Sequence, residues 1–331
     1  MIDEKDDHRS GDGARGPLPT LSVVIPVYNE CDSIERLYQR LLAVVAGLAV
    51  SGHEILFVDD GSRDASFSEV LRLGKADAAV RGIRFARNFG KEAAMAAGLR
   101  AASGDVVVLM DGDLQHPPEL IPAMFERWQD GARMVTAVRR SRDTDPWLRN
   151  MLSHAFYHLF ARLCEVSLAE GGGDFRLFDR AVVDAINSLA ERNRFMKGIT
   201  SWVGFRQDMV SFDPAAREAG GTRWSMWRLL RYALDGISAF STMPLRVWSL
   251  IGFWMAFLSG GYGVWLLLKT AIWGIDLPGY ASLMLAVLFT GGIQLISLGV
   301  LGEYIGRIFT EVKARPLYLV AETVGFEAPL R

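Results

Sequence analysis

Cysteine is scarce in this chain, whose 331 residues contain only Cys31 and Cys164. Two cysteines cannot build a disulfide framework, and neither one stands at the spacing of a zinc site. We therefore expect both to be reduced structural residues of a protein that works in the cytosol.

A strong charge of either sign is also missing. Lys and Arg number 36 against 38 Asp and Glu, which leaves a formal net charge of -2 at pH 7. This balance supplies no overall basic field, so we expect no nucleic-acid partner. An apolar leader is missing too, because residues 1–19 are rich in Asp, Gly, Arg and Pro. We predict that residues 1–20 form a disordered tail.

Apolar residues, by contrast, are abundant and unevenly placed. Hydrophobic residues make up 50% of the chain, the mean hydropathy is +0.17, and the excess lies after Pro244. Residues 247–268 and 277–302 carry no formal charge, and each run can cross a hydrocarbon layer of roughly 30 Å. We predict that residues 246–306 form a hairpin of two transmembrane helices. Glycines in both runs permit close helix contact, including contact between subunits of a homo-oligomer.

Basic residues mark both flanks of this hairpin. They are Arg223, Arg228, Arg231, Arg246, Arg307, Lys313 and Arg315. By the positive-inside rule both flanks face the cytoplasm, including a C-terminal tail of residues 307–331. Residues 223–245 place apolar side chains on one helical face and Arg on the other. This pattern predicts an amphipathic helix in the membrane interface, with a core-packed helix as the alternative.

Residues 21–222 have the pattern of an α/β domain. Short apolar runs typical of buried strands, such as 21–26, 54–58 and 106–109, alternate with helical segments. The alternation predicts a mostly parallel sheet with right-handed crossovers, and such sheets bind ligands beyond the carboxyl ends of their strands. Polar clusters follow these three strands, at 28–30, 59–62 and 111–113. We expect the functional site at that edge.

Two carboxylates stand at the end of the strand 106–109, in the stretch MDGDLQHPPE of residues 110–119. Because side chains alternate along an extended backbone, Asp111 and Asp113 leave the sheet on the same side. Mg²⁺ usually takes one or two protein carboxylates and completes its shell with water and phosphate oxygens. The pair therefore indicates a site for Mg²⁺ or Mn²⁺ carrying a diphosphate. A polar turn that caps the next helix is the alternative.

Six motifs together resemble the family-2 glycosyltransferases of the GT-A fold. They are PVYNE (26–30), VDDGSRD (58–64), RNFGKEAAMAAGL (87–99), MDGDLQHPPE (110–119), DFRLFDR (174–180) and ERNRFMKG (191–198). Within that family the chain is most similar to polyprenyl-phosphate sugar transferases, namely dolichyl-phosphate mannosyltransferase and the bactoprenol glucosyltransferases. The resemblance implies a GT-A (Rossmann-like) catalytic domain over residues 21–222. It also implies an integral protein of the inner or plasma membrane whose catalytic domain is cytoplasmic.

The reaction implied by the resemblance is the inverting transfer of one sugar from a nucleotide-sugar to undecaprenyl or dolichyl phosphate. UDP-glucose is the favoured donor. The donor would contact Pro26, Tyr28, Glu30, Asp59, Asp60, Lys91 and Asp111. Asp111, Asp113 and Gln115 would hold Mg²⁺ or Mn²⁺. His116 stands where many relatives carry Asp, and we expect it to be a surface turn residue.

The acceptor side implied by the family contains one acid and several cations. Asp174 matches the acidic position near the acceptor, as a base or an orienting group, with an ion pair to Arg176 as the structural alternative. A lipid phosphate has a second pKa of about 6, so positioning and charge compensation matter more than a strong base. The cationic candidates are Arg139, Arg149, Arg194 and Lys197. Contact with anionic lipid headgroups is the alternative for any one of them.

Two rival functions remain open. A processive polysaccharide synthase shares the catalytic fold, but it would carry a Gln-x-x-Arg-Trp motif. Neither Arg-Trp pair here fits that motif, because Arg127–Trp128 follows Met-Phe-Glu and Arg223–Trp224 follows Gly-Gly-Thr. A non-catalytic membrane scaffold on a degenerate transferase fold is the other rival. The intact acidic positions argue against it.

Overall fold

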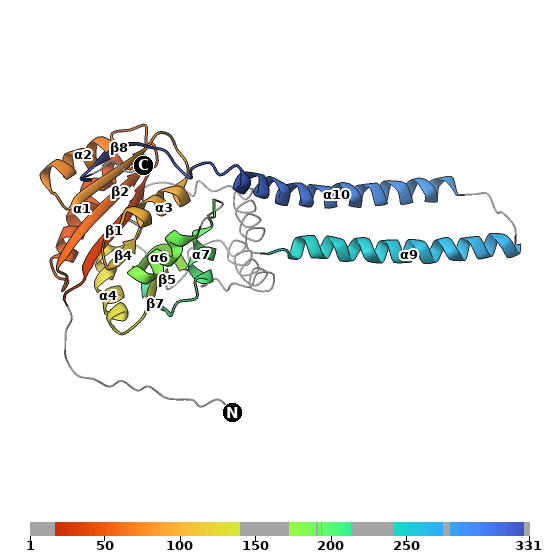
Figure 1. Ribbon diagram of the computed structural model, residues 1–331, viewed down its shortest axis with the longest axis horizontal. Helices are drawn as coiled ribbons and strands as arrows, with labels where there is room; N and C mark the ends of the chain where they lie inside the picture. Colours follow the sequence, from red (N-terminus) through yellow and green to blue (C-terminus); the bar gives the residue numbers. More distant parts are fainter. Residues whose placement is uncertain are drawn as a thin grey trace, which may run out of the picture.

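The chain folds into an α/β domain from which two long helices project side by side (Figure 1). The computed structural model describes residues 17–139, 172–189, 191–192, 194–212, 241–273 and 279–327. Most of the predicted N-terminal tail, residues 223–240 of the interfacial helix predicted over 223–245, and Arg149 lie outside these residues.

The domain is built on an eight-stranded sheet with the strand order β7-β5-β6-β4-β1-β2-β3-β8. The strands are β1 (Thr20–Val27), β2 (Gly52–Asp59), β3 (Val80–Phe85), β4 (Val106–Leu109), β5 (Met134–Arg139), β6 (Gly172–Asp179), β7 (Gln207–Phe212) and β8 (Val320–Val324). Strands β3, β2, β1 and β4 run parallel to one another, as β5 does to β7, whereas β6 and β8 are antiparallel to their neighbours. The predicted α/β fold with a mostly parallel sheet is confirmed.

Helices cover both faces of the sheet. They are α1 (Cys31–Val45), α2 (Ser66–Ala76), α3 (Lys91–Ala101), the 3₁₀ turn η1 (Pro118–Leu120), α4 (Ile121–Gln129), α6 (Arg180–Ser188) and α7 (Met196–Trp202). Along β1, Val23 and Ile25 belong to the core with α1, while Val24 belongs to the core with α3 on the other face. All three side chains have no exposed surface. A strand covered on both faces reads as a continuous apolar run, which is why residues 23–25 are VVI.

The antiparallel strand β6 decides which residues meet at the site. It lies between β4 and β5, and Leu109 at the end of β4 pairs with Arg176 in the middle of β6. Because the two strands run in opposite directions, the start of β6 lies at the edge where β4 ends. Asp174 therefore reaches the same edge as Asp111.

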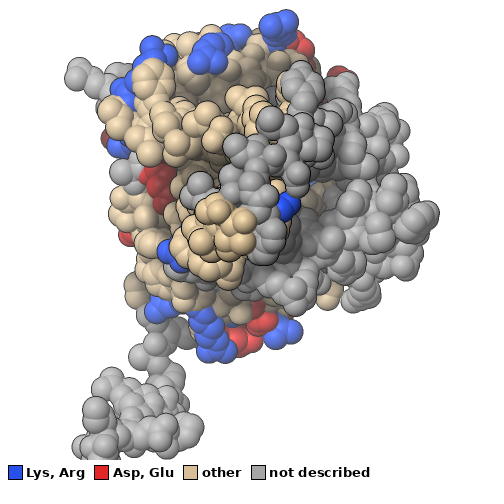
Figure 2. Space-filling model, turned by 90° about the vertical axis from the view of Figure 1, so that its right-hand side faces the viewer, with Lys and Arg blue, Asp and Glu red and all other residues tan. Residues whose placement is uncertain are grey.

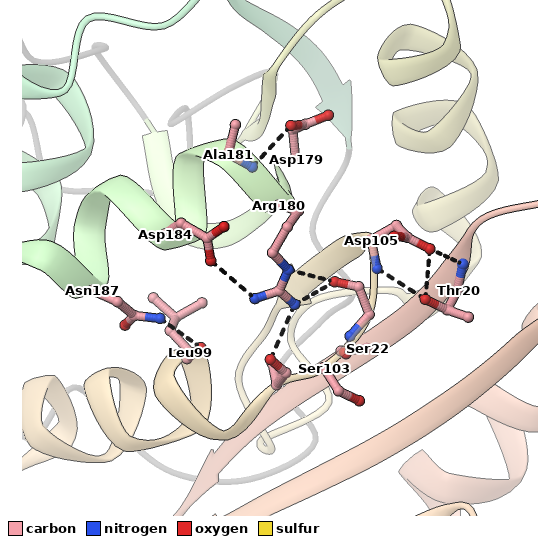
Figure 3. Close-up of polar contacts among 12 residues, drawn as sticks. Thr20, Ser22, Leu99, Ser103, Asp105, Asp179, Arg180, Ala181, Asp184 and Asn187 are labelled. Carbon is pink, nitrogen blue, oxygen red and sulfur yellow. Dashed lines mark hydrogen bonds and ion pairs between the residues drawn. The ribbon is translucent and has the colours of Figure 1, made fainter.

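The end of the sheet away from the site, where β1 and β4 begin and β6 ends, carries a polar network at the start of α6 (Figure 3). The Arg180 guanidinium donates to the carbonyl oxygens of Gly104, at 2.9 Å, and Ala102, at 3.0 Å. The Asp105 carboxylate accepts hydrogen bonds from the main-chain N–H and the hydroxyl of Thr20, at 2.8 and 2.7 Å. These bonds tie the end of β6 to the start of β4 and of β1. They add to the backbone pairing of β4 with β6 at the end of the sheet opposite the site.

The C-terminal segment 307–331, predicted as a cytoplasmic tail, contributes a strand to the catalytic sheet. Residues 307–312 belong to the second long helix, and β8 pairs antiparallel with β3 as an edge strand. Tyr318 stacks on Phe85 of β3 with ring centroids 4.8 Å apart. Apolar residues alternate too briefly in this short segment for the sequence alone to indicate a strand. The chain therefore returns from the hairpin to complete the sheet.

The two long helices, α9 (Met243–Trp273) and α10 (Tyr280–Val312), lie beside each other away from the domain (Figure 1). Their apolar side chains are exposed, for example Phe253 at 62% and Leu295 at 72%. Seen from the hairpin side, the described surface is mostly uncharged toward its centre, and charged residues, Lys and Arg above all, lie along its upper and lower margins (Figure 2). Among the described residues, one segment, Leu245–Trp265, is long and apolar enough to cross a membrane. The predicted hairpin of two transmembrane helices stays a prediction.

Candidate active site

The site lies at one end of the strands, where β1, β2 and β4 finish and β6 begins. Each strand contributes an acidic residue there: Glu30 after β1, Asp59 at the end of β2, Asp111 after β4 and Asp174 near the start of β6. The sequence prediction of a polar site at the carboxyl ends of the parallel strands therefore matches the geometry.

Lys91 joins two of these acids. Its Nζ lies 2.6 Å from Asp111 Oδ1 and 2.5 Å from Asp174 Oδ2. Burial of the ammonium opposes its charge, but the Asp111 and Asp174 carboxylates outweigh that effect and raise the pKa of Lys91 above its usual value. Burial likewise opposes the charge of Asp174, and Lys91 and Lys197 outweigh it and lower the pKa of Asp174 to about 2. The cluster is thus held together as ions.

The turn after β4 carries the predicted metal ligands. Asp111 is partly buried, with His116 Nδ1 3.7 Å from its Oδ2, and Asp113 is exposed. The Asp113 Oδ1 accepts a hydrogen bond from the main-chain N–H of Gln115 at 3.1 Å. Gly112 approaches β1 so closely that an added Cβ would lie 2.9 Å from Val27 Cγ1. A larger residue there would push the two carboxylates away from the sheet edge.

The donor set at this turn fits a hard divalent cation that brings further oxygen ligands with it. Burial, followed by the nearby charge of Asp113, raises the pKa of Glu30, so Glu30, Asp111 and Asp113 share one anionic field at two strand ends. Among the described residues, however, no three His, Cys, Asp or Glu side chains are arranged as a ready metal site. Mg²⁺ needs only one or two protein carboxylates when phosphate and water supply the rest.

A hollow of about 160 Å³ opens beside this turn. Glu30, Asp64 and Leu114 line it, together with Asn29, so the end of β1 and the turn after β4 share one concavity. Leu114 and Asn29 both have positive φ, 61° and 54°, which marks tightly bent loops at its rim. Of the other predicted donor contacts, Tyr28 directly precedes Asn29 and is 40% exposed, and Pro26 lies within β1.

Asp59 and Asp60, both predicted to contact the donor, are buried and engaged by the protein itself. Asp59 Oδ1 accepts the main-chain N–H of Ser62 at 3.0 Å. Asp60 accepts the main-chain N–H groups of Phe89 at 2.6 Å and Gly90 at 2.9 Å. Burial raises the pKa of each carboxyl. The structure thus shows Asp60 fixing the turn just before Lys91, and its contact with nucleotide stays a prediction.

The predicted acceptor cations fall into different environments. Lys197 of α7 lies close enough to Asp174 to lower its pKa. Arg194 instead donates to the carbonyl oxygens of Leu189 at 2.8 Å and Glu191 at 3.2 Å, which holds its own segment together. Arg139 ends β5 at the same edge of the sheet, paired with Phe212. Arg149 lies outside the described residues.

Arg176 is engaged differently from the predicted alternative of an ion pair with Asp174. Its Nε donates to the carbonyl oxygen of Gly173 at 3.1 Å, and its Nη1 donates to the Thr200 hydroxyl. Arg176 still adds to the positive field at Asp174. The close ionic partner of Asp174 is therefore Lys91, which belongs to a helix 83 positions earlier in the chain.

Sequence reasoning missed two residues of the site. His116 was predicted at the surface, but it is only 5% exposed, and its ring packs 5.3 Å from the ring of Phe175. That prediction is wrong because β6, which supplies Phe175, covers the turn. Glu92 accepts the main-chain N–H of Met196 at 3.1 Å. Burial and the nearby Asp174 raise the pKa of Glu92 to about 7. Its position next to Lys91 at the start of a helix was the available signal.

Known proteins share both parts of this architecture. Residues 22–186 match the family described as Glycosyl transferase family 2, and residues 243–308 match the family described as GtrB C-terminal hairpin. The chain is 48% identical over 307 residues to an uncharacterized glycosyltransferase of Synechocystis sp., covering 93% of this chain and 96% of that one. Among solved structures, mannosyl-3-phosphoglycerate synthase from Rubrobacter xylanophilus aligns with 67% of this chain and 72% of its own, at 19% identity and a TM-score of 0.46.

A second relative is a prophage-derived bactoprenol glucosyl transferase of Shigella flexneri. It is 46% identical over 303 residues, which cover 92% of this chain and 98% of that one. The resemblance predicted from the six motifs is confirmed by these matches. This chain belongs to glycosyl transferase family 2 and carries the GtrB C-terminal hairpin.

Proposed function

We propose that this protein transfers one glucose from UDP-glucose to a polyprenyl phosphate at a membrane surface, with inversion at the anomeric carbon. The observation that carries the proposal is the Asp111–Lys91–Asp174 cluster at the edge of the sheet. It stands in a chain 46% identical to a bactoprenol glucosyl transferase over nearly its whole length. The name of that relative, a bactoprenol glucosyl transferase, favours this function over a processive polysaccharide synthase and over a non-catalytic scaffold.

The reaction needs no covalent intermediate with the protein. A phosphate oxygen of the lipid attacks the anomeric carbon, the bond from that carbon to UDP breaks, and its electron pair leaves with UDP. Catalysis then depends on orientation and on compensating negative charge. Asp111 and Asp113, with Gln115 beside them, would hold a divalent cation that neutralises charge on the departing diphosphate.

Asp174 orients the acceptor side in this proposal and does not serve as a strong base. Its pKa is lowered to about 2, so it takes up a proton poorly near pH 7. The acceptor phosphate has a second pKa of about 6 and has already lost most of its protons at that pH. Asp174 instead holds the Lys91 ammonium in place, with Lys197 nearby to attract the phosphate.

The hairpin would bring the acceptor to this site. Its exposed apolar side chains suit a lipid environment, and α10 leads directly back to the catalytic domain. Glu311 at the end of α10 accepts the main-chain N–H of Arg192 at 2.9 Å, and the carbonyl oxygen of Arg315 accepts from the Arg192 side chain, also at 2.9 Å. The segment that leads into Lys197 is thereby attached to the end of the hairpin. A membrane-bound lipid phosphate would be presented within reach of that segment.

A transfer assay tests the proposal. Purified protein in detergent is given short-chain polyprenyl phosphate, Mg²⁺ or Mn²⁺, and a panel of radiolabelled UDP- and GDP-sugars, with Asp113→Ala beside the wild type. Label in a lipid carrying a single sugar, only with wild type, metal and UDP-glucose, is the expected result. Longer saccharide products would favour a processive synthase. Nucleotide binding without any labelled lipid would favour the scaffold.

A further inference from the structure

The Lys91 ammonium lies between Asp111 and Asp174. It neutralises Asp111, a carboxylate that a bound metal cation would otherwise neutralise. We infer that Lys91 is the resident cation of the resting site, and that it releases Asp111 when a divalent cation enters together with the nucleotide-sugar. The inference rests on the proposed function, because it concerns how the donor and its cation gain access to the same carboxylates.

The geometry gives Lys91 two anchors that differ in their later roles. Its Nζ is at 2.6 Å from Asp111, a proposed metal ligand, and at 2.5 Å from Asp174, which faces the acceptor side. Losing the first contact leaves the second intact. An ammonium on a four-carbon stem can make that small movement without any shift of the helix.

The backbone beneath Lys91 is fixed, so the movement would be confined to its side chain. Lys91 is the first residue of α3, and the turn before it is held by Asp60 through the N–H groups of Phe89 and Gly90. Gly61 packs against this turn so tightly that an added Cβ would lie 2.5 Å from the carbonyl carbon of Arg87. The Lys91 side chain can therefore move while its backbone stays fixed.

The charges explain why a bare cation would gain little at the resting site. Asp111 already has a cation within ion-pair distance, and no ready group of three metal-ligating side chains exists among the described residues. A divalent ion that arrives alone must displace Lys91 and collect most of its ligands from water. A divalent ion that arrives with a diphosphate already has phosphate oxygens as ligands. The Lys91 ammonium that it displaces from Asp111 can then pair with the negative charge of the donor diphosphate.

Mn²⁺ binding in the absence of nucleotide tests the inference directly. We expect wild-type protein to bind Mn²⁺ weakly by isothermal titration or by the spin resonance of free Mn²⁺. Lys91→Met removes the competing charge and keeps a side chain of similar length. It should bind Mn²⁺ at least about tenfold more tightly, because a unit charge within 4 Å is a strong competitor at a partly buried site.

Matched variants separate the charge of Lys91 from the size of its side chain and from the charge of its neighbour. Lys91→Arg keeps the charge and should bind Mn²⁺ as weakly as wild type, whereas Lys91→Gln should repeat the gain if Lys91→Met does not fold. Lys197→Met removes the other lysine near Asp174 and should give a smaller gain. Equal Mn²⁺ affinity in wild type, Lys91→Met and Lys91→Gln would overturn the inference, as would an equal gain in Lys197→Met. Failure of the proposed function would show separately, as unlabelled lipid in the transfer assay.

Discussion

Glu92 at the start of α3 accepts the main-chain N–H of Met196, the first residue of α7, at 3.1 Å. This bond joins the helix that carries Lys91 to the helix that carries Lys197. Burial and the adjacent Asp174 outweigh the two lysines and raise the pKa of Glu92 to about 7. The bond therefore couples the donor side and the acceptor side through a carboxyl that changes charge near neutral pH.

The stability of the protein should depend on the charge of Glu92. A carboxyl whose pKa rises from 4.5 unfolded to about 7 folded stabilises the fold below pH 4.5, and this contribution is lost as pH rises through 7. Relative to Glu92→Gln, wild type should therefore lose melting temperature between about pH 5 and about pH 8, an interval that spans most of this loss. Thermal unfolding in detergent at both pH values measures the difference. Glu126→Gln, an exposed change on α4, should show no such trend.

Asp113 should matter for transfer far more than for folding. The side chain is exposed and accepts one main-chain hydrogen bond, from Gln115. Asp113→Asn should lower kcat/KM by about 100-fold if this carboxylate helps to neutralise the diphosphate, since removing one such stabilising group typically costs that much. Initial rates measure the loss, and the melting temperature should stay near that of wild type. Asp130→Asn, at an exposed position after α4, is the matched control, and an equal loss there would contradict the role of Asp113.

Asp60 should act through the turn that it holds. Asp60→Ala leaves the main-chain N–H groups of Phe89 and Gly90 without their acceptor, which should cost about 1–3 kcal/mol of stability. The backbone turn before Lys91 would also no longer be held in place, so the transfer rate should fall in the protein that remains folded. Asp60→Asn keeps one carbonyl acceptor, so its stability and its transfer rate should lie between those of wild type and Asp60→Ala. Full transfer by folded Asp60→Ala would show that the turn does not position Lys91.

Arg180 should affect stability alone. It donates to the carbonyl oxygens of Ala102 and Gly104 at the edge of the sheet opposite the site (Figure 3). Arg180→Ala should destabilise the domain by about 1–3 kcal/mol, since charge-assisted hydrogen bonds are lost and carbonyl groups are left unpaired. The melting temperature should fall, while the KM for the donor at low temperature stays that of wild type. A raised donor KM would contradict this prediction and would mean that the network also positions the site.

The local features of the chain were predictable because they depend on neighbouring residues. Uninterrupted apolar runs indicated strands buried on both faces, and their alternation with helical segments indicated a mostly parallel sheet. The positions of Glu30, Asp59 and Asp111 at strand ends followed from the same pattern. The six motifs then predicted the family, which the comparisons confirm.

Tertiary structure decided what depends on contacts between distant segments. The place of β6 between β4 and β5 brings Asp174 to Lys91 and buries His116, and the return of β8 to β3 makes part of the predicted tail an edge strand. Periodicity reports how a residue is buried but not which distant strand pairs with it, because hydrogen bonds between strands are alike for every sequence. The sequence therefore determined the elements and their polar ends. Only the long-range pairing of antiparallel strands determined which charged groups share the site.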